Sequence, residues 1–275
     1  MKTKLFILIL FCFGALISSA QSTPVAVADK CPATENWKTQ RWAIGVNVNT
    51  VEPITDAGFD FNEFSVRTFS NGNEKDESYC IGLNIAYKIK ENCALRLSAR
   101  MTNYKVTETV DFRAFSPSPS DYGLNSSDIK QSMFAISPGI LWNSNYKKLN
   151  YYGGFQLVYR QYSSVIGNTD YRDYLFANNA LISVQNYYQT EPGGYSIGLG
   201  PVVGFSVNVF KYLSIGAEFS TAYSYYKTGG AITTAKTNIF PASVAGPPSI
   251  NISALRFQGF KFSSILSTIN VAFNF

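Results

Sequence analysis

Five charged side chains could do chemistry together in this chain, because the sequence pattern places them on one side of its strands. They are Lys88, Arg96, Arg100, Arg160 and Glu218. Each stands in a run where large apolar residues alternate with small or polar ones, and each occupies a position of the small or polar set. Charges that share a narrow interior are strongly unfavourable unless a partner or water satisfies them. We therefore predict ion pairing within this set.

Glu218 is the carboxylate of the set, and Arg96 and Arg100 are its expected partners. All three lie a few residues from a short connection in the sequence, so they stand at similar heights in the fold. In an eight-stranded barrel, long side chains can meet across the interior. Two interpretations follow from a Glu218 pair with Arg96 or Arg100. It is a structural core of ion pairs, or it is a gate for conduction.

The chain contains no histidine, which bears on enzymatic and metal-binding functions. The commonest general base of hydrolases is therefore missing, and so is every metal site that needs imidazole. Cys31, Cys80 and Cys93 lack the CxxC spacing of a zinc site. The glycines recur at strand period with no helix after them, unlike a phosphate-binding loop. We expect no enzymatic activity, no metal and no cofactor.

The strands that must position these charges are marked by an apolar residue at every second position. In "SYCIGLNIAYKI", for example, Tyr79, Ile81 and Leu83 alternate with Cys80 and Gly82. Alternation over ten or more residues predicts a strand with two different faces. The pattern recurs in eight segments, which are 41–51, 78–89, 93–105, 131–143, 150–162, 195–209, 212–225 and 260–275.

The connections between these segments alternate between short and long. Turns such as "KEN" and "FKY" are short, whereas four connections are long, at 52–77, 106–130, 163–194 and 226–259. Outer-membrane barrels have short periplasmic turns and long extracellular loops. The sequence thus predicts an all-β fold over 41–275, an eight-stranded antiparallel transmembrane β-barrel with both termini in the periplasm. Two alternatives stay open: ten strands, if "FNEFSVRTFS" at 61–70 joins the barrel, and a soluble β-sandwich.

The first forty residues are expected to lie outside the barrel. Residues 1–20 have two lysines, an apolar run and a small-residue ending "SSA", as in a secretory signal peptide. Residues 21–40 are then a periplasmic N-terminal segment. Without Lys2 and Lys4, 23 basic residues become 21 against 18 acidic ones, a net charge of +3. This balance gives no sign of nucleic-acid binding.

The predicted topology restricts the disulfides that three cysteines can form. Cys80 and Cys93 stand at opposite ends of one hairpin, about 30 Å apart at the rise of a strand, so they cannot bond. Cys31 belongs to the periplasmic segment, on the side of the barrel where Cys93 lies. Cys31–Cys93 is therefore a candidate disulfide in a compartment that permits one.

Several stretches together resemble the small outer-membrane β-barrel proteins of Bacteroidota, in the broad OmpA/OmpX-like barrel group. They are "SSAQS", "ISPGILW", "GLGPVVGF", "LSIGAEFS" and the terminal "NVAFNF". The resemblance implies residence in the bacterial outer membrane. It also implies that the barrel-assembly machinery reads the last strand, through Phe275, Phe273, Val271 and Ile269.

The expected function is non-enzymatic, with long external loops displayed for adhesion, recognition or envelope integrity. One alternative is a narrow, porin-like pore or carrier for small or hydrophobic solutes. Another is an accessory barrel of an envelope secretion or assembly complex. The expected partners are outer-membrane lipid, the assembly machinery and an external ligand at the loops. We expect a monomer that binds no nucleic acid.

Overall fold

The computed structural model describes residues 41–51, 73–111, 121–146, 148–175, 180–240 and 246–275. They belong to one compact unit, Glu35–Phe275, and the other unit, Met1–Thr34, lies outside the described residues. The predicted signal peptide and periplasmic segment therefore remain predictions. No helix in the described ranges is long and apolar enough to cross a membrane.

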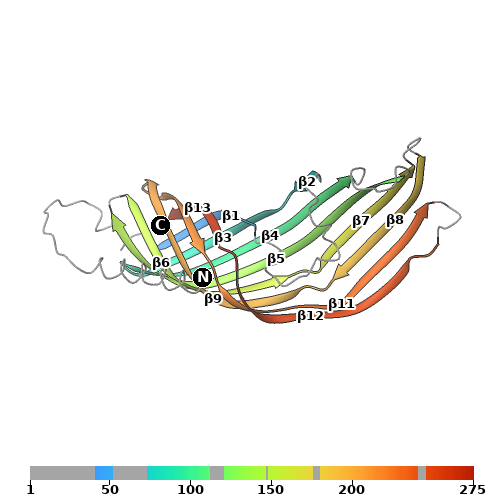
Figure 1. The fold of residues 1–275 in the computed structure, drawn as a ribbon. Coiled ribbons are helices and arrows are strands. Elements are labelled where there is room, and N and C mark those ends of the chain that lie inside the picture. Colours follow the sequence, from blue (N-terminus) through green and yellow to red (C-terminus); the bar gives the residue numbers. More distant parts are fainter. Residues whose placement is uncertain (1–40, 52–72, 112–120, 147, 176–179, 241–245) are drawn as a thin grey trace, which may run out of the picture. The chain divides into compact units, whose positions relative to one another are not determined.

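The described residues form thirteen strands in one antiparallel sheet (Figure 1). Their bounds are β1 Trp42–Asn49, β2 Asn73–Asp76, β3 Tyr79–Lys90, β4 Cys93–Asp111, β5 Asp121–Tyr146, β6 Leu149–Tyr162, β7 Val165–Leu175, β8 Ala180–Glu191, β9 Gly194–Phe210, β10 Leu213–Ser220, β11 Tyr223–Phe240, β12 Ser249–Phe262 and β13 Leu266–Asn274.

The strand pairings return to their starting point, so the sheet closes into a barrel. One circuit runs β5–β6–β9–β10–β13–β1–β3–β4 and back to β5. A longer circuit leaves β5 through β7, β8 and β11 before it rejoins β9. The predicted all-β antiparallel fold is confirmed. The predicted count of eight strands is not confirmed, because the described residues form thirteen strands and the longer circuit passes through ten of them.

Three of the four connections that we predicted as long loops consist largely of strands, so that part of the prediction is wrong. β4 and β5 extend into 106–130, β7 and β8 occupy most of 163–194, and β11 and β12 occupy most of 226–259 (Figure 1). These strands carry polar residues on both faces, which removes the alternation. Cross-strand polar bonds hold them instead, such as Ser127 Oγ to Thr169 Oγ1 at 2.7 Å and Asn186 Nδ2 to Asp170 Oδ1 at 2.7 Å.

The first long connection is different, because most of it lies outside the described residues. Residues 52–72 are not described, so the structure does not test whether 61–70 forms a further strand. Asn73–Asp76, in the remainder of this connection, forms β2 and pairs with β4.

Hydroxyl groups occupy the points where one strand ends and the next begins. At each point a side-chain oxygen accepts a backbone N–H from an adjacent strand or, at Ala222, from the residue just before a strand, which satisfies a donor that the ladder leaves over. The four contacts are Ser267 N to Thr50 Oγ1 at 3.0 Å, Lys105 N to Ser78 Oγ at 3.0 Å, Ser132 N to Ser163 Oγ at 2.9 Å, and Ala222 N to Ser263 Oγ at 3.0 Å.

The two faces of the barrel are inverted relative to a soluble protein. Large apolar side chains are exposed all around the outside, while polar ones make up most of the buried residues. We call this outer surface the apolar belt. Aromatic residues mark both of its rims, with Trp42, Trp142, Tyr151 and Tyr212 at one and Tyr79, Tyr159, Tyr195 and Tyr223 at the other. Beyond the second rim the outward positions turn polar, at Thr50, Glu77, Asn103, Ser132, Gln161, Lys227 and Gln258.

Candidate functional site

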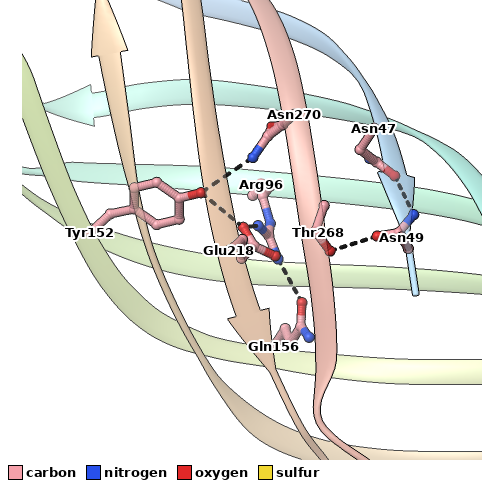
Figure 2. A network of polar contacts seen from close by, with 8 residues as sticks. All are labelled: Asn47, Asn49, Arg96, Tyr152, Gln156, Glu218, Thr268 and Asn270. Atoms are coloured by element: carbon pink, nitrogen blue, oxygen red, sulfur yellow. Dashed lines mark hydrogen bonds and ion pairs between the residues drawn. The ribbon is translucent and has the colours of Figure 1, made fainter.

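An ion pair between Arg96 and Glu218 crosses the interior of the barrel (Figure 2). Arg96 comes from β4 and Glu218 from β10, which are separated by three strands in one direction around the shorter circuit and by three in the other. Both side chains are buried, since the two residues are 6% and 5% exposed. Their ladder neighbours are small, with Gly139 beside Arg96 and Gly204 beside Glu218, so the long side chains have room.

Neutral polar groups add hydrogen bonds to this pair, although the Arg96 Nε donor is buried without a partner among the described residues. Arg96 Nη2 donates to Gln156 Oε1 at 2.6 Å, and the Tyr152 hydroxyl donates to Glu218 Oε2 at 3.1 Å. Asn270 Nδ2 lies 3.5 Å from the Tyr152 oxygen, at the long end of hydrogen bonding. β4, β6, β10 and β13 are thereby tied together through the interior. Hydrogen bonds of this kind offset part of the cost of burying an ion pair.

A second polar chain joins β1 to β13 close by (Figure 2). Asn49 Nδ2 donates to Asn47 Oδ1 at 2.6 Å, and Thr268 Oγ1 donates to Asn49 Oδ1 at 2.6 Å. All three residues are buried. We refer to the eight residues drawn in Figure 2 as the interior network.

The other predicted interior charges are placed as follows. Arg100 and Arg160 are buried, and Arg160 Nη1 donates to Ser224 Oγ at 3.3 Å, which links β6 to β11. Lys88 is half-buried near the end of β3. Of the two partners that we expected for Glu218, the ion pair is made by Arg96.

Sequence reasoning missed the neutral members of the interior network. Tyr152, Gln156 and Asn270 stand at inward positions of their strands, at the same period that located the charges. The two-residue period therefore marks these neutral residues as inward too, but the prediction considered charged residues alone. A buried charge pair has more bonding capacity than one partner can satisfy. Looking for inward amides and hydroxyls at similar heights would have found these groups.

The last strand lies between the first strand and β10. β13 pairs with both of them, and Phe275 O accepts from Trp42 N at 2.8 Å. Phe275, Phe273, Val271 and Ile269 are all exposed on the outside, within the apolar belt. Their recognition by an assembly machinery stays a prediction.

The cysteines and acidic residues give no metal site in the described ranges. Those ranges contain no cluster of three or more His, Cys, Asp or Glu side chains able to hold a metal ion. Cys80 and Cys93 form no disulfide with each other, and Cys80 Sγ accepts from Thr102 Oγ1 at 3.0 Å. Because Cys31 lies outside the described residues, the Cys31–Cys93 disulfide stays a prediction.

Just beyond the apolar belt, Glu77 forms ion pairs with Lys105 and Lys75. The two ammonium groups, Lys105 foremost, lower the pKa of the Glu77 carboxyl from 4.5 to about 2. A depressed pKa stabilises the folded state above the unfolded value, and this contribution is lost as the pH falls toward the folded value.

We therefore predict that Glu77→Gln lowers the stability of the protein at pH 6 and that the difference shrinks as the pH falls through about 2. The effect should fade between about pH 4.5 and 2, where the carboxylate of the wild type takes up its proton. Urea unfolding of both proteins across this range measures the difference. A gap that persists unchanged at pH 2 would contradict the assignment, and Lys75→Gln should reproduce part of the effect.

Among known proteins, the chain is similar only to solved structures, and at low sequence identity. No protein-family model matches the chain, and no curated protein matches it. The chain is similar to the Neisserial surface protein A, with 13% identity, a TM-score of 0.34, and coverage of 85% of this chain and 97% of that one. It is also similar to a major outer membrane protein of Thermus thermophilus, with 11% identity, a TM-score of 0.36 and coverage of 85% and 99%. The attachment invasion locus protein Ail of Yersinia pestis shows 11% identity, a TM-score of 0.30 and coverage of 86% and 97%.

Proposed function

We propose that this chain is a barrel of the bacterial outer membrane, of the broad OmpA/OmpX-like group of Bacteroidota. The apolar belt supports this location, because exposed aliphatic side chains between two aromatic rims match a hydrocarbon layer between two interfaces. The polar interior supports it too, since most of the buried residues are polar or charged, unlike those in the core of a soluble fold. Eight strands, those of the shorter circuit, cross the membrane in this proposal.

Within that location, the barrel displays its outer strands to partners outside the cell. The observation that carries this proposal is a set of large apolar side chains exposed far beyond the belt. On β12, Ile250 and Ile252 are 63% and 66% exposed, and Ile239 on β11 and Tyr188 on β8 are exposed as well. Ile252 precedes Phe260 of the belt by eight residues, or about 26 Å of strand. At that distance lipid does not cover it, so a partner surface is the expected use.

The interior favours display over conduction or catalysis. The interior network ties opposite walls together with direct hydrogen bonds, as expected of a scaffold. Catalysis would need a base, a nucleophile or a metal, and the chain has no histidine. The protein acts in this proposal without turnover, as a support for the surface formed by β7, β8, β11 and β12.

The test replaces both isoleucines with aspartate, as Ile250→Asp/Ile252→Asp, in producing cells. Because a carboxylate cannot be buried in an apolar contact, attachment of the cells to polystyrene and to one another should fall several-fold. Ile250→Val/Ile252→Val is the matched control and should keep both activities. The amount of folded barrel in the membrane fraction is measured for each variant. Unchanged attachment at equal barrel levels would argue against display.

A further inference from the structure

Two cations stand side by side on the outside of the barrel, next to its outer aromatic rim. Lys227 on β11 and Arg256 on β12 are both exposed, and the two strands run together along their length (Figure 1). Lys227 pairs with Gln258 in the ladder and Arg256 with Gly229, so the two cations are diagonal neighbours on one face. Diagonal neighbours lie about 7–8 Å apart, a span that two long side chains can close around one anion.

A glycine on β11 lets β11 and β12 approach each other closely beside the two cations. Gly229 has φ +84°, a conformation that suits glycine, and a Cβ there would lie 2.3 Å from the Leu255 carbonyl oxygen. The next outward pair is Ala231 and Ala254, both exposed. Small residues therefore border the two cations on the outer side, and no bulky side chain of these strands stands over them.

Neither cation is neutralised by a residue that the structure describes. Within the described ranges, no ion pair involves Lys227 or Arg256. Their outward ladder partners are Tyr195, Gln258 and Gly229, and none is acidic. The opposite holds for Lys75 and Lys105 at the same rim, where Glu77 pairs with both. Two unpaired cations at one place leave room for an external anion.

Four aromatic rings lie on the membrane side of the two cations. Tyr225 and Phe260 are the next outward pair after Lys227, followed by Tyr223 and Phe262. The Tyr223 ring lies 5.7 Å from that of Phe260 and 4.9 Å from that of Phe262, and Tyr225 lies 5.2 Å from Phe260. Together they form a continuous apolar surface that ends at the cations. A ligand that fits both parts has an anionic head and hydrocarbon chains.

We propose that Lys227 and Arg256 bind the phosphate of an acylated lipid of the outer leaflet, whose acyl chains lie on the four rings. The proposal rests on the outer-membrane location proposed above. The guanidinium group supplies two parallel N–H donors to phosphate oxygens, and the ammonium group supplies a point charge. The phosphate stands at the height where the belt ends, as a headgroup does at the edge of a hydrocarbon layer.

The experiment measures lipid that stays with the barrel after refolding into phosphatidylcholine vesicles. One set of vesicles contains lipid A with its phosphates, and the other contains dephosphorylated lipid A. Lipid bound per protein is counted by native mass spectrometry after gentle extraction. A cation near a membrane surface strengthens binding of an anionic lipid roughly fivefold, so two contribute roughly 30-fold at low salt. The wild type should retain phosphorylated lipid A well above the dephosphorylated form.

Lys227→Gln/Arg256→Gln should abolish that preference, and about 0.5 M salt should weaken it in the wild type. Lys90→Gln/Lys148→Gln removes the same charge at exposed positions of the opposite rim and should leave the preference unchanged. Equal retention of both lipids, or equal loss in both variants, would overturn the proposal. Displacement by millimolar inorganic phosphate would overturn it in favour of a site for free phosphate.

Failure of the membrane location is separable from failure of the lipid site. Folding and insertion are followed by heat-dependent gel mobility and by resistance of the belt strands to protease. A chain that never inserts would overturn both proposals. A chain that inserts normally but shows no lipid preference would overturn the lipid site alone.

Discussion

Glu218→Ala is expected to destabilise the barrel by about 3–5 kcal/mol, because it leaves a buried guanidinium without its counter-charge. Arg96 is 6% exposed and has Gln156 as its remaining hydrogen-bond partner in the interior network. A neutral amide cannot compensate a full charge in a narrow interior. Urea unfolding of the refolded protein in lipid vesicles, followed by heat-dependent gel mobility, measures the change in free energy of unfolding.

Two further variants separate loss of the ion pair from loss of packing. Arg96→Met/Glu218→Leu removes both charges and fills the space, so it should recover most of the stability lost in Glu218→Ala. Tyr152→Phe removes one hydrogen bond from a neutral hydroxyl to the same charged carboxylate and should cost about 1.5–3 kcal/mol. A Glu218→Ala protein that unfolds within about 0.5 kcal/mol of the wild type would show that the pair contributes little. Equal destabilisation in the double variant would point to packing instead.

The side of each strand could be predicted from the sequence because a barrel between lipid and a polar interior separates its residues strictly. Arg96 and Glu218 belong to different strands, yet the two-residue period alone places both inside. The sequence limited the partner of Glu218 to Arg96 or Arg100, because all three residues lie a few residues from a short turn. The final choice depends on the stagger between strands, which sets which side chains face each other across the interior. The residue pattern of a single strand does not determine this stagger, because it is a property of how neighbouring strands pair.

The outer part of the fold could not be predicted for a different physical reason. β7 and β8 carry polar residues on both faces, so apolar residues do not alternate along "VIGNTDYRDYL". The hydroxyl contacts at Thr50, Ser78, Ser163 and Ser263 could not be predicted from the sequence either, because serine and threonine are common in loops. Their role becomes visible only when the neighbouring strand is in place.

Leu97→Arg is expected to destabilise the folded barrel by about 2–4 kcal/mol, the cost of an arginine at the middle of a bilayer. Leu97 is 44% exposed and lies opposite Ile85 and Pro138, halfway between the aromatic rims of the belt. On a soluble protein, an arginine at so exposed a position changes stability by about 0.5 kcal/mol or less. The size of the loss therefore reports whether lipid surrounds the belt.

Ile252→Arg is the matched control, since it makes the same chemical change at a position that is 66% exposed but far outside the belt. Water should solvate that arginine, so the free energy of unfolding in vesicles should stay within about 0.5 kcal/mol of the wild type. If Leu97→Arg were as harmless as Ile252→Arg, the belt would not be in lipid. If both were costly, the hydrocarbon layer would extend to the part of β12 that carries Ile250 and Ile252, and these two side chains would face lipid rather than a partner.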